Sequence, residues 1–99
     1  MNDVPQFDEL IHPATRLSIV ALLAAADWAD FAFIRDQLGM SDSALSKQLT
    51  TLEEAGYVTI ERPVSDRRRR VRARLTPLGR ERFTGHVAAL QGIISTAAS

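Results

Sequence analysis

Residues 30–61 read DFAFIRDQLGMSDSALSKQLTTLEEAGYVTIE and contain two helical patterns separated by Gly39. Glycine adopts a left-handed backbone without steric cost, so Gly39 is well suited to end the first helix. Ser41 is placed to cap the second helix, which we expect over about residues 42–55. The apolar residues of the two helices recur three or four positions apart: Phe31, Ile34 and Leu38, then Leu45, Leu49 and Leu52. The stretch therefore predicts two helices joined by a tight turn.

After Gly56 the period of the apolar residues changes from about 3.6 to 2, the spacing of half-buried strands. The alternating residues are Val58 and Ile60 in one run and Val71, Ala73 and Leu75 in the next. We expect an antiparallel hairpin whose tip contains residues 67–70, Arg-Arg-Arg-Arg. Residues 29–31 are expected to add a short extended piece.

The flanking segments complete a mainly helical fold. Val4, Phe7, Leu10 and Ile11 have helical spacing, which predicts a short first helix ending near residues 12–13. A second helix should run from about residue 13 to 25, and a terminal helix from about 77 to 96, after a Thr-Pro start signal. The fold class is therefore mainly α with a small β-hairpin (α+β), as a single domain over residues 1–99.

The two parts of the chain carry opposite charge. Residues 1–61 contain three Lys or Arg and ten Asp or Glu, a formal balance of −7. Residues 62–99 contain nine Arg and two acids, a balance of +7. A basic segment on an acidic body indicates local contact with a polyanion, because fixed positive charge displaces the counterions of nucleic acid.

The order of two helices, a tight turn, a third helix and a basic hairpin is that of a winged helix-turn-helix. Residues 10–23, 30–61 and 68–83 (LIHPATRLSIVALL, the stretch quoted above, and RRRVRARLTPLGRERF) resemble the MarR/ArsR-type winged helix-turn-helix transcriptional regulators. The similarity covers about residues 7–90 and is strongest to a short MarR-like subgroup that is little more than the DNA-binding domain.

The resemblance implies a homodimeric, sequence-specific double-stranded DNA-binding regulator, more often a repressor. The helix at about 42–55 would enter the major groove, and the arginine-rich wing, residues 62–74, would contact the backbone or minor groove. Two alternatives stay open. One is a winged-helix module that binds protein, and the other is a small-molecule-gated sensor of the same fold, for which the sequence indicates no effector.

The residues expected to contact DNA follow from the rotation of the helix at 42–55. At 100° per residue, with the leucine stripe inward, Ser43 and Lys47 point outward, and Ser46 and Gln48 lie on the flanks. The amide of Gln48 is able to pair with the N6/N7 edge of adenine. The complete candidate set is Ser43, Ser46, Lys47, Gln48, Arg67, Arg68, Arg69, Arg70 and Arg72. Alternatively, Arg72 and Arg74 form ion pairs with acids of the protein itself.

The terminal helix carries an apolar seam with steps of four, three and four residues: Phe83, Val87, Leu90 and Ile94. Such a 3.5-residue average period is typical of helices that pack in a coiled-coil manner. The seam predicts a homodimer interface, which would place two recognition helices roughly 34 Å apart, one turn of DNA. The alternative is that this helix packs only on its own domain.

No residue pattern indicates an enzyme, a cofactor or a metal site. The chain contains no cysteine, and its two histidines have no ligand-spaced neighbours. We expect His12 at a helix boundary and His86 at the surface. Glu53 and Glu54 diverge by 100° on a helix, so they cannot form a catalytic pair. The first residues do not resemble a signal peptide, and the apolar run from 17 to 26 is too short to span a bilayer, which predicts a cytoplasmic protein without membrane association.

Overall fold

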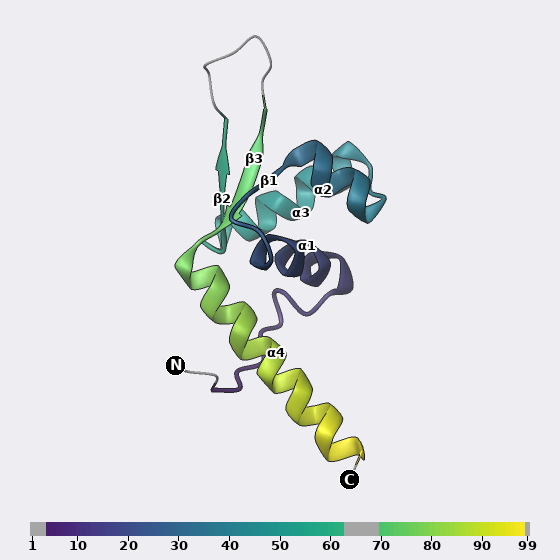
Figure 1. Ribbon diagram of the computed structural model, residues 1–99, viewed down its shortest axis with the longest axis vertical. Helices are drawn as coiled ribbons and strands as arrows, with labels where there is room; N and C mark the ends of the chain where they lie inside the picture. The colour runs from purple at the N-terminus through teal and green to yellow at the C-terminus, as the bar shows by residue number, and fades with distance from the viewer. Residues whose placement is uncertain (1–3, 63–69, 99) are drawn as a thin grey trace.

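The computed structural model describes residues 4–62 and 70–98 as four helices and a three-stranded sheet. The elements are α1 (Ala14–Ala24), β1 (Ala29–Asp30), α2 (Phe31–Leu38), α3 (Asp42–Glu54), β2 (Val58–Glu61), β3 (Arg72–Leu75) and α4 (Pro77–Ala98). Helices α1, α2 and α3 gather beside the β2–β3 hairpin, whereas α4 extends away from them (Figure 1). The predicted fold class, mainly α with a small sheet, is confirmed.

The sheet is antiparallel with the order β1-β3-β2, so β3 is its central strand. Val58 pairs with Leu75 across the hairpin, and Ala29 of β1 pairs with Ala73 on the other edge of β3. Both the predicted hairpin and the short extended piece before α2 are confirmed. The Phe31 N–H donates to the Val71 carbonyl at 2.7 Å, which fixes the start of α2 against the hairpin.

The ends of the helices follow the local signals in the sequence. Gly39 ends α2 with a φ of 64°, a left-handed conformation that favours glycine. The Ser41 hydroxyl accepts the Ala44 N–H at 3.1 Å and so caps α3. At the start of α4, the Thr76 hydroxyl accepts the N–H of Gly79 at 3.0 Å. Gly79 also allows close packing, because a Cβ at this position would overlap the backbone of Tyr57.

The core lies where the three packed helices meet the inner face of the sheet. Its buried apolar residues are Ile11, Ile19, Val20, Leu23, Ala29, Ile34, Leu45, Leu49, Leu52, Tyr57, Val58, Ala73 and Leu75. Each leucine or isoleucine buried in this way stabilises the fold by about 1.5–3 kcal/mol relative to exposure. Both helices of the predicted pair contribute their apolar stripes to this one cluster, in which each of them packs on α1.

The second half of α4 leaves the body of the domain. Its first half contacts α1 and β3, but residues 91–97 are all exposed. Ile93 and Ile94 are 56% and 66% exposed, which is unusual for isoleucine. Within residues 4–62 and 70–98, no helix combines the length and hydropathy needed to cross a membrane.

The predicted first helix is wrong. Residues 4–12, which we call the N-terminal strap, contain no helix and run beside α4, where the Gln6 N–H donates to the Gly85 carbonyl at 2.9 Å. Asp8 provides the physical reason, because its backbone N–H and its carboxylate form hydrogen bonds with distant residues and not with a helix of its own. Its N–H donates to His86 Nδ1 at 3.0 Å, and its carboxylate accepts the Tyr57 hydroxyl at 2.6 Å. Tertiary partners therefore override the local helical spacing.

His86 was expected at the surface, and this too is wrong, because its side chain is fully buried. Its Nδ1 accepts the Asp8 N–H, so the ring proton belongs on Nε2, which faces His12 Nδ1 at 3.3 Å. The ring of Phe7 packs against both imidazoles, with centroids 4.7 Å from each. Burial lowers the pKa of His86, the neighbouring His12 lowers it further, and Asp8 acts in the opposite direction.

This cluster predicts a stability that depends on pH. Because the folded state lowers the pKa of His86, neutral His86 stabilises the fold fully above the ordinary value of about 6.5. That stabilisation is lost as the pH falls through the lowered pKa, since a protonated Nδ1 cannot accept the Asp8 N–H. We expect the free energy of unfolding, measured with urea, to decrease between about pH 7.5 and 5.

The matched control is His86→Asn, whose Oδ1 accepts the same N–H without titrating. Its unfolding free energy should vary less with pH than that of the wild type, even if it is lower throughout. Equal pH profiles for the two proteins would show that His86 is not the group responsible.

Candidate DNA interface

Helix α3 presents a polar face to solvent because its leucine stripe is buried. Leu45, Leu49 and Leu52 are 0%, 4% and 0% exposed. Ser43, Ser46 and Lys47 are exposed, as the rotation of the helix predicted. The exposed face formed by Ser43, Ser46 and Lys47 therefore carries two hydroxyl groups and one cation. Such groups are able to reach base edges in a major groove.

An ion-pair cluster fixes the turn between α2 and α3. Arg35 contacts the carboxylates of Asp36 and Asp42 at 2.9 Å each. The hydrogen bonds to Asp36 and then Asp42 raise the pKa of Arg35 above its ordinary value. Asp42 also lies in the first turn of α3, where a negative charge interacts well with the helix dipole. The single guanidinium offsets one of the two negative charges beside the start of α3, which reduces their repulsion of phosphate.

The wing consists of β2, β3 and the connection between them, and its two strands lie beside α2 and α3 (Figure 1). Arg67, Arg68 and Arg69, three of the predicted contact residues, lie outside the described residues. Arg62 and Arg70 border that segment on either side, and both are exposed. The cations that the structure does describe at this end of the hairpin are thus accessible to a ligand.

A groove of about 210 Å³ joins α3 to the wing. Phe31 and Leu49 are among its apolar lining residues. Its polar residues come from both elements: Ser46, Thr50 and Glu53 from α3, and Arg62 from the end of β2. Ser46 and Arg62 therefore share one continuous surface, as a joint contact of helix and wing with one duplex requires.

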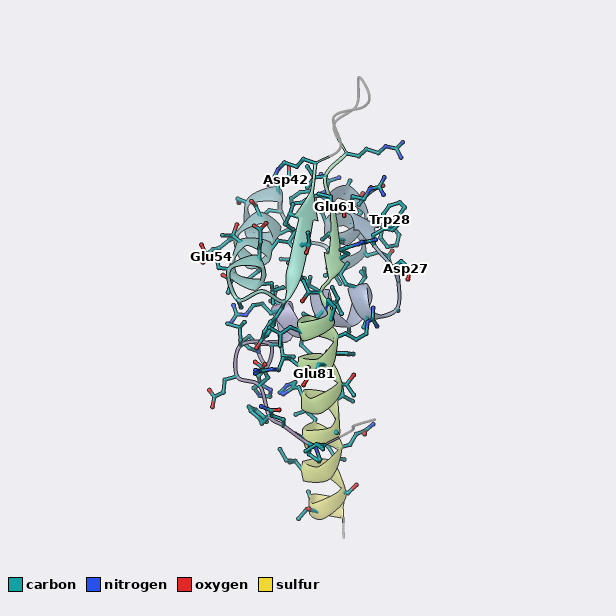
Figure 2. All side chains as sticks on the ribbon, turned by 90° about the vertical axis from the view of Figure 1, so that its left-hand side faces the viewer. Asp27, Trp28, Asp42, Glu54, Glu61 and Glu81 are labelled. Carbon is teal, nitrogen blue, oxygen red and sulfur yellow. The ribbon has the colours of Figure 1, made fainter. Side chains whose placement is uncertain are left out.

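Arg72 has an intramolecular partner that the sequence did not indicate. Its guanidinium carbon lies 4.1 Å from the centre of the Trp28 ring, within the range of a cation–π contact. Trp28 lies on the opposite side of the hairpin from Glu54 of α3 (Figure 2). Arg72 therefore contacts the protein on the side away from α3, and its role in binding DNA stays a prediction.

For Arg74 the alternative interpretation is the one that the geometry favours. Its Nε lies 3.9 Å from Oε2 of Glu61 on the neighbouring strand. Both side chains are partly exposed, and such pairs contribute at most about 1 kcal/mol. Arg72 and Arg74 therefore each have a partner in the protein, whereas Arg70 has none in the described part of the chain.

Gln48 is half-buried and is held by Arg16, a residue that sequence reasoning missed. Arg16 Nη1 donates to Gln48 Oε1 at 2.9 Å, and Arg16 Nε donates to the Leu10 carbonyl at 2.6 Å. The predicted pairing of Gln48 with adenine uses the same Oε1 and would compete with Arg16. No sequence signal could have indicated the contact, because Arg16 and Gln48 are 32 positions apart and meet only through the packing of α1 on α3.

Three packed helices and a three-stranded sheet define a winged helix fold, in which the β2–β3 hairpin lies beside the third helix. The chain belongs to the winged helix DNA-binding domain family, whose model matches residues 15–94. The match includes α3, the wing and most of α4. The resemblance to MarR/ArsR-type winged helix regulators is thereby confirmed at the level of family and fold.

Known proteins extend this similarity over most of the chain. The uncharacterized protein MJ0432 of Methanocaldococcus jannaschii is 27% identical over 79 residues, which cover 80% of this chain and 86% of that protein. The structure of a transcriptional regulator homologue from Pyrococcus horikoshii OT3 superposes with a TM-score of 0.87 at 23% identity, covering 91% of this chain and 89% of the other. At this identity, the second comparison supports the fold alone.

A further solved structure contains DNA. Overoxidized AbfR bound to DNA superposes with a TM-score of 0.70 at 25% identity, covering 78% of this chain and 56% of the AbfR chain. A fold of this kind is therefore compatible with a DNA complex.

Proposed function

We propose that this protein is a homodimeric, sequence-specific double-stranded DNA-binding transcriptional regulator, and that it acts as a repressor. Helix α3 enters the major groove, and the wing lies on the backbone or in the minor groove. The observation that carries the proposal is the shared surface of Ser46 and Arg62, which joins the polar face of α3 to the basic wing. Membership of the winged helix DNA-binding domain family supports the same partner.

Electrostatics support this orientation on DNA. Residues 62–99 carry nine of the twelve cations, and Arg62 and Arg70 are exposed beside the wing tip. The remaining acids, such as the exposed Glu54 at the end of α3, favour entry of α3 by its N-terminal half. Ser43 and Lys47 lie in that half and would face the bases. Repression requires only that a bound dimer occupies its site, without catalytic chemistry, a cofactor or a metal; such a regulator would be cytoplasmic.

A second copy of the chain is the proposed occupant of the exposed part of α4. A groove of about 690 Å³ lies between the strap and α4, lined by apolar residues that include Pro5, Phe7 and Ile93. Of the predicted seam, Phe83 packs partly on its own core, whereas Leu90 is half-buried and Ile94 is 66% exposed. We therefore place the dimer contact toward the far half of α4 and include the strap. A two-fold arrangement of these surfaces brings two α3 helices to one face of DNA.

On α3, Lys47→Ala should change which DNA site is preferred as well as the affinity. Loss of one base contact changes discrimination by about 1–3 kcal/mol. The measurement is selection from a randomised duplex pool, with Glu81→Ala on the exposed surface of α4 as the control. If Lys47→Ala selects the wild-type site with wild-type stringency, Lys47 does not read a base.

On the wing, Arg70→Ala should weaken binding to specific and unrelated duplexes by similar factors. The slope of log K against log salt should become shallower by about 0.9, because one phosphate contact is lost. Arg74→Ala is the matched control, since Arg74 is paired with Glu61. A slope that is the same in wild type and Arg70→Ala would remove Arg70 from the phosphate contacts.

For the dimer, Ile94→Asp should produce a monomer that keeps its fold, because Ile94 is already exposed in the single chain. A carboxylate buried in the interface without a partner costs several kcal/mol. Sedimentation equilibrium should show the monomer, and affinity for a site with two half-sites should fall sharply. Ala21→Asp, at an exposed position of α1, should remain dimeric. A dimeric Ile94→Asp protein would place the interface elsewhere.

A further inference from the structure

We propose that Arg16 and Gln48 together bind a phosphate of the DNA backbone, at the edge of the major groove opposite the wing. The inference rests on the proposed function, because it assumes that α3 enters the groove. It assigns Arg16 of α1 a role in binding and gives Gln48 a different partner from the adenine edge that its side-chain type predicted.

The chemistry of the pair selects an acceptor as the ligand. A guanidinium has five N–H donors and no acceptor, so the Gln48 amide must direct its oxygen toward Arg16. The free end of that amide is its NH₂ group, which is a donor. Arg16 uses Nε and Nη1 for Leu10 and Gln48, and Nη2 makes no hydrogen bond within the described part of the chain. The pair thus presents only donors, which matches a phosphate oxygen and not the mixed donor and acceptor edge of adenine.

The charges of the first 61 residues point to the same ligand. This segment has three cations, and one of them, Arg35, is paired with Asp36 and Asp42. Arg16 and Lys47 have no carboxylate within ion-pair distance among residues 4–62 and 70–98. Arg16 Nη2, which makes no hydrogen bond in the described part of the chain, is not buried. An uncompensated and solvent-accessible guanidinium on an acidic body is suited to an anion from outside.

The position of Gln48 on α3 decides between a phosphate and a base. Ser46 and Gln48 each lie about 100° from Lys47 around the helix axis, one on either flank of the exposed face. Ser46 lines the groove toward the wing, which places Gln48 on the opposite flank. A helix about 10–12 Å across fills a major groove about 12 Å wide, so its two flanks meet the backbones on the two edges. Gln48 is half-buried and bonded to Arg16, so it is less free than the exposed Lys47 to extend toward the floor of the groove.

The pair is also held in place before DNA arrives. Arg16 Nε donates to the Leu10 carbonyl at 2.6 Å, and its Nη1 bond to Gln48 limits rotation of both side chains. Both side chains are thus already ordered in the free protein, so less conformational entropy is lost when DNA binds. The wing and the Arg16–Gln48 pair would then contact backbone on both sides of α3.

The informative variant is Gln48→Glu. A carboxylate still accepts the Arg16 hydrogen bond, so the melting temperature should be equal to or above that of the wild type. It removes the NH₂ donor and brings a negative charge to the proposed phosphate. We expect affinity to fall by about tenfold or more, because like charges placed together at an interface are strongly unfavourable. The factor should be the same for a selected site and an unrelated duplex, measured by fluorescence anisotropy with the full chain.

Two further variants complete the test. Arg16→Met should make the slope of log K against log salt shallower by about 0.9, the value for one lost phosphate contact. Glu81→Gln makes the reverse exchange at an exposed position in the first half of α4 and should bind DNA as the wild type does.

The outcomes separate this inference from the proposed function. If the wild type binds DNA and both Gln48→Glu and Arg16→Met bind equally well with an unchanged salt slope, the phosphate site is refuted while the regulator proposal stands. If Gln48→Glu changes the preferred sequence in a randomised-site selection, Gln48 reads a base and the phosphate assignment is wrong. A wild-type protein that binds no duplex refutes both proposals.

Discussion

Burial of the leucine stripe of α3 is the constraint on which the interface depends. Leu45, Leu49 and Leu52 enter the core together, and each contributes about 1.5–3 kcal/mol relative to exposure. A rotation of α3 by one residue would expose part of this stripe and bury Ser46 or Gln48 in its place. The free energy of packing therefore fixes which side chains face outward. The polar face, the groove shared with the wing and the contact with Arg16 all follow from this rotation.

Elements with local determinants could be predicted from the sequence. The period of the leucines predicted α3 and its outward face, and Gly39 and Ser41 predicted the turn and cap before it. The change of period after Gly56 predicted the hairpin. These signals succeed because helix caps, left-handed glycines and two-residue alternation are decided within a few residues of chain. Three of the four expected contact residues on α3, Ser43, Ser46 and Lys47, are exposed for the same reason, although their binding to DNA stays a prediction.

The features that could not be predicted depend on partners far away in the chain. The strap has helical spacing, but Asp8 bonds to His86, 78 positions away, and to Tyr57, 49 positions away. His86 is buried because this N–H partner satisfies its ring, which no local pattern indicates. In the same way, Arg72 contacts Trp28 through the β1–β3 pairing. Each error concerns a polar side chain whose environment is created only when the elements pack.

The strap connects the two surfaces to which we assign binding. At one end, Asp8 bonds to His86 on α4, beside the groove proposed for the second copy. A few residues later, the Leu10 carbonyl accepts Arg16, which in turn holds Gln48 on α3. The Asp8 carboxylate also accepts the Leu10 N–H at 2.9 Å, so these contacts form one continuous chain of hydrogen bonds. The same short segment of the strap thus supports both His86 on α4 and Arg16 on α1. A partner that favoured one position of the strap would change the affinity for DNA. By linkage, DNA would then change the affinity for that partner by the same factor.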